Sequence, residues 1–155
     1  MIKSKKKNLI GWEEWCSFPD LGLPLIKAKI DTGAKTTALH ADDLEVFYKD
    51  GVKYIRFTVH PIQKNHDIVR ICEAPIVDHR RITSSNGEKE KRFVIKTTFL
   101  IGEISFEANV TLTTRYGMTF RMLLGKEALK QGKFIIDPAK SFVLGKHKDV
   151  KDLYL

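Results

Sequence analysis

The chain has 155 residues but only two cysteines, Cys16 and Cys72. That number does not suit the disulfide framework of a small secreted domain, and two reduced thiols fit better. No apolar run approaches the roughly 18 residues of a membrane-spanning helix. The apolar stretch that follows the basic residues 1–7 is too short to be the core of a signal peptide. These absences favour a cytoplasmic protein.

The sequence also lacks the motifs of several common active sites. It has no glycine-rich phosphate loop, so we expect no ATP binding, and no HExxH helix or Cys/His cluster that would hold zinc. His60 and His66 are the one closely spaced histidine pair, and they flank a polar loop, where histidines are usually solvated. We therefore expect no metal and no other cofactor. Zinc hydrolysis remains an alternative, which predicts sensitivity to chelators.

Positive charge exceeds negative charge. There are 27 lysines and arginines against 19 aspartates and glutamates, which gives a formal net charge of +8. We predict a basic solvated arm over residues 1–8, one domain over 9–145, and a tail over 146–155 that either packs on the domain or mediates pairing. The excess charge fits nucleic-acid contact, an acidic substrate or simple solubility.

Three aromatic residues near the start of the chain have two interpretations. Trp12, Trp15 and Phe18 could form a stacking platform for bases. Glu13 and Glu14 lie among them and would repel phosphate. Packing in the core or in a hairpin is therefore the better interpretation.

The most informative stretch is residues 25–40, LIKAKIDTGAKTTALH. Apolar and basic residues alternate up to Ile30, which predicts a strand that runs directly into Asp31, Thr32 and Gly33. An aspartic protease needs a carboxylate at a rigid strand end, a hydroxyl that can brace it, and a glycine that lets another backbone approach closely. The same three residue types are good turn formers, so a simple strand-to-turn exit is the alternative.

A second stretch strengthens the first. Residues 120–134, FRMLLGKEALKQGKF, contain two leucines and Gly125, followed by a predicted short helix over 126–131. With both stretches the chain resembles the retropepsin-like aspartic proteases, the single-domain relatives of the retroviral proteases. The resemblance implies that the strand ending at Gly125 passes behind the Asp-Thr-Gly loop.

Within that family the chain is similar to a bacterial group labelled ATP-dependent zinc proteases. The shared features are the IDTGAKTTALHA core at residues 30–41 and a basic hairpin that reads RRITSSNG at residues 80–87. The likeness covers nearly everything from Ile10 to Gly145. This group is associated with ATP-grasp ligases that add glutamate tails to a ribosomal protein.

Residues 74–101 are predicted to form a hairpin, with strands over 74–82 and 92–101 and a turn at 85–87. By resemblance it is the flap that closes over substrate in retropepsins. It concentrates positive charge that solubility does not require, at Arg80, Arg81, Lys89, Lys91 and Arg92. A basic flap favours an acidic peptide, whereas a solvated edge hairpin protected from aggregation by its charges is the alternative. As exposed charges these residues would add little to stability.

The candidate site combines these motifs. The resemblance gives catalytic roles to Asp31, Thr32 and Gly33. It gives supporting roles to Leu123, Leu124 and Gly125. The expected substrate contacts are Ala34, Arg80, Arg81, Ser84, Ser85 and Arg92.

The implied fold is all-β: a closed retropepsin-like barrel with one short helix and a flap-like hairpin. Because the sequence holds a single Asp-Thr-Gly, the resemblance implies a homodimer with one Asp31 from each chain. Two carboxylates about 3 Å apart share a proton, so one can activate water while the other polarises the scissile carbonyl. The expected function is hydrolysis of an acidic or glutamate-rich peptide. The alternative is a non-catalytic barrel that binds RNA or an acidic protein and tolerates the loss of Asp31.

Overall fold

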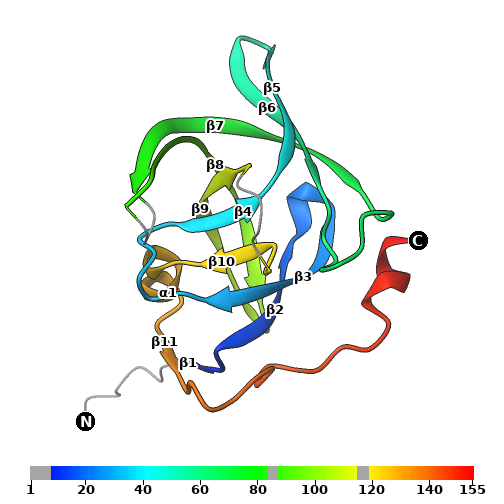
Figure 1. Cartoon of the computed structure of the whole chain (residues 1–155), viewed down its shortest axis with the longest axis vertical. Coiled ribbons are helices and arrows are strands. Elements are labelled where there is room, and N and C mark those ends of the chain that lie inside the picture. Colours follow the sequence, from blue (N-terminus) through cyan, green and yellow to red (C-terminus); the bar gives the residue numbers. More distant parts are fainter. Residues whose placement is uncertain (1–7, 84–86, 115–118) are drawn as a thin grey trace.

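The computed structural model describes residues 8–83, 87–114 and 119–155, and almost all of its regular structure is β (Figure 1). The elements in chain order are β1 (Asn8–Ile10), β2 (Glu13–Phe18), the 3-10 turn η1 (Pro19–Leu21), β3 (Leu23–Ile30), β4 (Thr37–His40), β5 (Asp42–Lys49), β6 (Val52–Val59), β7 (Arg70–Thr83), β8 (Lys89–Ile101), β9 (Ile104–Thr113), β10 (Met122–Leu124), α1 (Lys126–Gln131), β11 (Phe134–Ile136) and the 3-10 turn η2 (Val150–Tyr154). The predicted basic arm lies outside the described residues except for Asn8, which begins β1.

Six strands close a barrel in the order β2–β3–β10–β4–β9–β8, and a pairing of Ser17 with Leu100 joins β2 to β8. β7, β6 and β5 continue the same sheet outward from β8. β1 and β11 form a separate parallel pair. The predicted closed all-β barrel is confirmed, as is the short helix, since α1 has the predicted bounds.

The core fills the barrel with side chains from alternating strand positions. Ile55, Phe57 and Val59 of β6, which the alternation predicts to face inward, are fully buried. Both cysteines are free, buried thiols. Burial raises the pKa of the Cys72 thiol to about 12 and also raises the pKa of Cys16, so neither thiol is poised to ionise at neutral pH.

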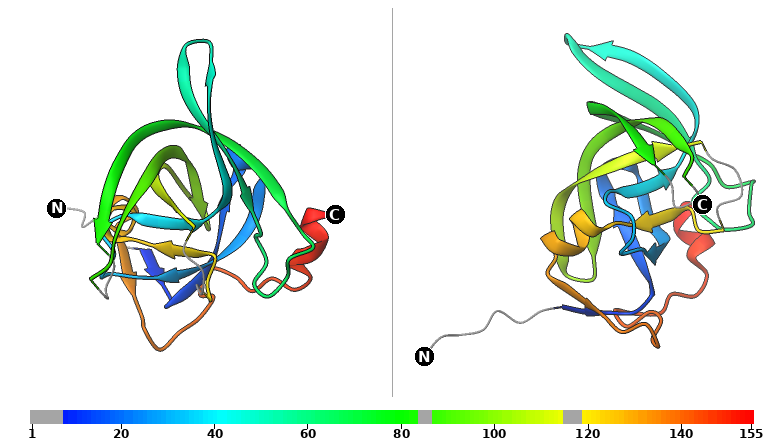
Figure 2. Two further views of the ribbon diagram at one scale, coloured as in Figure 1. Left: turned by 45° about the horizontal axis from the view of Figure 1, so that its top comes forward. Right: turned by 60° about the vertical axis from the view of Figure 1, so that its left-hand side comes forward.

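The hairpin of β5 and β6 projects away from the barrel (Figure 1 and Figure 2). Its turn lies between Lys49, the last residue of β5, and Val52, the first residue of β6. Asp50 and Gly51 both have positive φ, at 51° and 78°, which a tight hairpin turn requires at its two central positions. β6 pairs with β7 only from Tyr54 to Val59, so the tip of this hairpin extends beyond the rest of the sheet.

The aromatic residues near the start pack largely as predicted. Phe18 is fully buried, and Trp15 stacks on Phe142 with ring centroids 5.8 Å apart. Trp12 departs from the expectation, because 37% of it is exposed. It lies in the bend between β1 and β2, outside the strand pairing, and meets Phe120 edge-on.

The chain after β11 runs along the outside of the barrel (Figure 1). Its last turn, η2, packs on the body: Tyr154 is buried, its hydroxyl donates a hydrogen bond to the Leu25 carbonyl, and burial raises its pKa to about 12. Arg70 Nη2 donates to the Tyr154 carbonyl at 2.6 Å. Of the two roles left open for the tail, packing on the domain is the one observed. None of the helices in the described ranges is long and apolar enough to cross a membrane.

A buried carboxylate fastens this outer segment to the barrel. Glu14 of β2 is fully buried and accepts backbone hydrogen bonds from Gly11 at 2.6 Å, Val143 at 3.0 Å and Leu144 at 3.1 Å. Burying a carboxylate is costly unless donors of this kind surround it. Glu14 therefore ties together two segments that are far apart in the sequence.

We expect Glu14→Ala to lower the free energy of unfolding by about 3 kcal/mol or more, because it removes three hydrogen bonds to a charged group. The matched control is Glu13→Ala. Its half-buried carboxylate accepts a hydrogen bond from Ser141 Oγ at 3.2 Å, and its loss should cost about 1 kcal/mol or less. Urea denaturation of both variants measures the difference. Equal losses would show that Glu14 has no special role.

Candidate active site

The Asp-Thr-Gly sequence forms the turn that leaves β3. The backbone N–H of Asp31 donates to the Leu124 carbonyl at 2.9 Å, which fixes the residue to β10. Its carboxylate is half-buried, and Oδ1 accepts a hydrogen bond from the Gly33 backbone N–H at 3.0 Å. Asp31 is thus held at both backbone and side chain while its carboxylate stays accessible.

β10 passes between the two strands that flank this loop. Leu124 pairs in parallel with Ile30 of β3, and Leu123 pairs antiparallel with Ala38 of β4. Leu124 is fully buried, whereas Leu123 lines the cavity beside Asp31. The arrangement is the threading that the resemblance implied for this stretch.

Gly125 sits where the chain needs a residue without a side chain. A Cβ at this position would lie 2.5 Å from the Thr36 carbonyl carbon, closer than any real contact. The Gly125 N–H donates to Thr37 Oγ1 at 3.1 Å, and the next two N–H groups donate to the carbonyls of Ala34 and Lys35 at 2.7 and 2.9 Å. The start of α1 is therefore hydrogen-bonded to the backbone of the loop that carries Asp31.

Thr32 and Gly33 form the exposed tip of the loop. Within the described part of the chain, the Thr32 hydroxyl has no hydrogen-bond partner. A Cβ at Gly33 would meet only the Asp31 carboxylate, at 3.3 Å. Inside one chain the close backbone approach thus occurs at Gly125, and the tip is left open to solvent.

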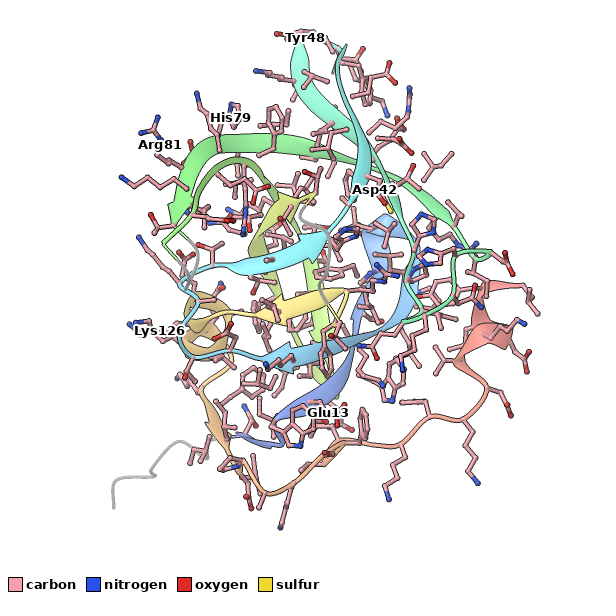
Figure 3. The ribbon with its side chains drawn as sticks, in the orientation of Figure 1. Glu13, Asp42, Tyr48, His79, Arg81 and Lys126 are labelled. Carbon is pink, nitrogen blue, oxygen red and sulfur yellow. The ribbon has the colours of Figure 1, made fainter. Side chains whose placement is uncertain are left out.

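A cavity of about 580 Å³ opens beside Asp31. The loop that carries Asp31, the hairpin of β7 and β8, and strands β4, β9 and β10 all contribute residues to its lining. Figure 3 shows Arg81 on β7 and Lys126 at the start of α1 on the same side of the molecule. The cationic lining residues are Lys35, Arg80, Arg81 and Arg92.

Strand register divides the basic residues of the flap between its two faces. Arg80 pairs with Arg92, and Arg81 pairs with Lys91. Because side chains alternate along a strand, Arg80 and Arg92 share one face, and Lys89 and Lys91 lie on the other. Arg81 is exposed yet contributes to the cavity rim. The five charges that the sequence groups together are therefore not equivalent.

Arg92 corrects one expectation. It is only 9% exposed, so it is not a solvated surface charge. Its Nε donates to Glu90 Oε2 at 2.9 Å, and Glu90 in turn accepts a hydrogen bond from Thr113 Oγ1 at 3.2 Å. Sequence alternation could not reveal this burial, because the bend of the hairpin over the barrel brings Arg92 toward β9.

Arg80 is held from two sides. Its Nε donates to Asp78 Oδ2 at 2.6 Å, and this bond is the main reason why the pKa of Asp78 is lowered. Its Nη1 lies 3.9 Å from Oε1 of Glu127 in α1. The cavity-facing arginines thus have acidic neighbours that the sequence did not single out.

Thr36, Thr37, Glu90 and Glu127 are supporting residues that sequence reasoning missed. Thr36, Thr37 and Glu127 stand inside the IDTGAKTTALH and GKEAL motifs, but their contacts cross about 90 positions of the chain. Ser84 and Ser85, the remaining predicted substrate contacts, lie outside the described residues, as does most of the predicted turn.

The histidine pair considered for zinc lies at the end of β6. The rings of His60 and His66 meet edge-on with centroids 5.7 Å apart, and His60 Nε2 is 3.8 Å from Asp42 Oδ2. No group of three or more His, Cys, Asp or Glu side chains with metal-binding geometry occurs in the ranges that the structure describes.

Comparison with known proteins agrees with this geometry. A family model described as retropepsin-like aspartic endopeptidase RimB matches residues 9–147. A probable alpha-L-glutamate ligase from Shewanella halifaxensis is 46% identical over 148 residues, which cover 96% of this chain and 32% of that protein. One from Desulfotalea psychrophila is 45% identical over 145 residues, covering 94% of this chain and 31% of that protein. The chain spans about a third of the length of these curated relatives.

Among solved structures, a protein of unknown function (DUF785) from Legionella pneumophila superposes with a TM-score of 0.78. It is 28% identical, and the match covers 90% of this chain and all of that one. The family model, the barrel and the threading of β10 behind the Asp-Thr-Gly loop lead to the same conclusion: this chain belongs to the RimB-like family of retropepsin-like aspartic endopeptidases.

Proposed function

We propose that this protein hydrolyses peptide bonds with a pair of Asp31 carboxylates, one from each chain of a homodimer. The observation that carries the proposal is the Asp31 carboxylate, held rigidly by Gly33 and Leu124 at the edge of a cavity large enough for peptide side chains. One chain offers one such carboxylate. A twofold axis beside the exposed loop tip would supply the second.

The chemistry follows from the electrostatics of the pair. Two carboxylates within about 3 Å share one proton, because both cannot ionise cheaply. The ionised member takes a proton from water, whose oxygen attacks the carbonyl carbon of the substrate. The protonated member donates a hydrogen bond to the carbonyl oxygen. Breaking the C–N bond then requires a proton on the leaving amine, which the pair supplies.

The tip of the loop suits a symmetric contact. The Thr32 side chain is exposed, and its hydroxyl is available to brace the partner's loop. Gly33 adds no side chain between the two carboxylates. In this proposal both residues act across the dimer.

The charges of the cavity support an acidic substrate. Four of the lining side chains are cationic, and Asp31 is the one acidic lining residue in the described ranges. Arginine forks bind carboxylates with two parallel hydrogen bonds, and Arg92 holds its charge where water is scarce. The curated relatives carry this region within chains named probable alpha-L-glutamate ligase. A glutamate-rich peptide fits both observations.

We expect Asp31→Asn to lower kcat by about 10²–10⁴-fold, because it removes the acid–base pair. Thermal melting should not change, since the Asn amide oxygen can still accept the hydrogen bond from Gly33. Hydrolysis of a glutamate-rich peptide by both proteins, with and without a chelator, measures this. Full activity of the variant, lost on chelation, would support zinc hydrolysis instead. RNA binding by both proteins without any hydrolysis would support a binding module.

If two chains form the site, specific activity should fall when the protein is diluted below the dissociation constant of the dimer. An excess of the Asp31→Asn variant should inhibit the wild-type protein by forming mixed dimers, whereas an equal excess of an unrelated protein should not. Activity that is independent of concentration, from a protein shown to be monomeric by sedimentation, would contradict the shared site.

Arg80→Ala should lower kcat/KM on a glutamate-rich peptide by about ten- to hundredfold, because it removes a charge-assisted hydrogen bond of about 1.5–3 kcal/mol. Lys91→Ala removes the same charge from the outer face of the hairpin and should change kcat/KM by less than about threefold. Higher salt should lower the kcat/KM of the wild-type protein more than that of Arg80→Ala. Equal effects of the two substitutions would show that the flap attracts the peptide only through its overall positive charge and that Arg80 makes no specific contact.

A further inference from the structure

The Glu127 side chain contacts both the loop that carries Asp31 and the flap. It is the second residue of α1, and its backbone N–H donates to the carbonyl of Lys35 at 2.9 Å. Its Oε1 accepts a hydrogen bond from Thr36 Oγ1 at 3.2 Å. Both bonds fasten Glu127 to the loop that begins with Asp31.

The same carboxylate oxygen faces the flap. Arg80 Nη1 lies 3.9 Å from Glu127 Oε1, and both side chains are 34% exposed. The other end of the guanidinium is held within its own strand, where Nε donates to Asp78 Oδ2. Among the residues that the structure describes, Arg80–Glu127 is the one ion pair that joins the flap to α1.

The two acidic partners of Arg80 differ in the element that carries them and in their distance from the guanidinium. Asp78 belongs to β7 and moves with Arg80, and its bond is short at 2.6 Å. Glu127 belongs to α1, which is anchored to the catalytic loop, and its oxygen is too far from Nη1 for a hydrogen bond. An exposed, loose ion pair of this kind is weak and exchanges readily.

We propose that Glu127 is an internal carboxylate that holds the flap arginine above the catalytic loop in the free protein and gives way to a carboxylate of the substrate. This inference rests on the proposed function, because it requires an acidic peptide in the cavity. A substrate carboxylate can approach the free edge of Arg80 as a close, two-bonded partner, which Glu127 does not do. Glu127 thus competes with the ligand for Arg80. Because weakly acidic or misplaced ligands displace it less well, Glu127 is a specificity-determining residue.

Glu127→Gln tests the proposal, because the amide oxygen still accepts the Thr36 hydrogen bond while the charge is gone. With Asp31→Asn present to prevent cleavage, we expect the Kd of a glutamate-rich peptide to fall by about two- to fivefold, the usual size of an exposed ion pair. In the active protein KM should fall by the same factor. The gain should disappear at high salt and for a peptide with neutral side chains.

The matched control is Glu107→Gln. Glu107 lies on β9 near α1 and 3.9 Å from Lys96, so this substitution makes the same change in charge at an equally loose ion pair that does not involve Arg80. It should leave the Kd unchanged. The effect of Glu127→Gln should also disappear when Arg80 is already alanine, because the two residues act as one pair. If Glu127→Gln folds poorly, Glu127→Asp, which withdraws the carboxylate by one methylene, should tighten binding in the same direction.

The following results would overturn this inference. An unchanged or higher Kd for Glu127→Gln would show that Glu127 does not compete for Arg80. An equal decrease in Kd for Glu107→Gln would show that the effect comes only from the change in net charge. A peptide that is bound and cleaved, with neither variant altering Kd, would remove the role of Glu127 and leave the proposed function intact. Failure of every variant to bind acidic peptide would instead remove the proposed substrate, and this inference with it.

Discussion

The site depends on the close contact between Gly125 and the backbone of Thr36. At that point β10 leaves the barrel and α1 begins, and the absence of a side chain lets successive N–H groups bond to Thr37, Ala34 and Lys35. These bonds fix the path of the loop that carries Asp31. Any side chain at residue 125 would push the loop away from β10, because a Cβ there has no space. The position of Asp31 thus depends on backbone packing at Gly125 as well as on the hydrogen bonds of the aspartate itself.

Strand register determines which of the flap's charged side chains face the barrel. The pairing of Arg80 with Arg92 puts both on one face, and the curvature of the hairpin turns that face toward the barrel. Each arginine is balanced within its own strand, by Asp78 and Glu90 respectively. These internal acids offset the positive charge of the cavity lining, and in the proposed function the terminal guanidinium nitrogens bind the substrate. Burial strengthens the field of Arg92, because less water screens it.

The barrel separates stability from chemistry. Its stability comes from the apolar interior and from buried polar ties such as Glu14, which holds the outer segment after β11. In the proposed function, its chemistry lies instead at the exposed tip of the Asp-Thr-Gly loop, where one chain supplies a single Asp31 carboxylate. A carboxylate needs a second carboxylate for aspartic catalysis, so the tip of this loop is where assembly and activity meet in the proposed function.

The sequence alone determined the strands with regular alternation and the helix at Lys126–Gln131, which are local patterns. The resemblance to the retropepsin-like family, and not the residue pattern itself, implied that the Leu-Leu-Gly strand lies behind the Asp-Thr-Gly loop. Tertiary structure decided the rest. The burial of Arg92, the contact of Glu127 with Thr36 and Arg80, and the role of Glu14 all join residues that are distant in sequence or bent toward each other by the barrel. Such contacts depend on register, curvature and closure, which the order of residues along one strand does not specify.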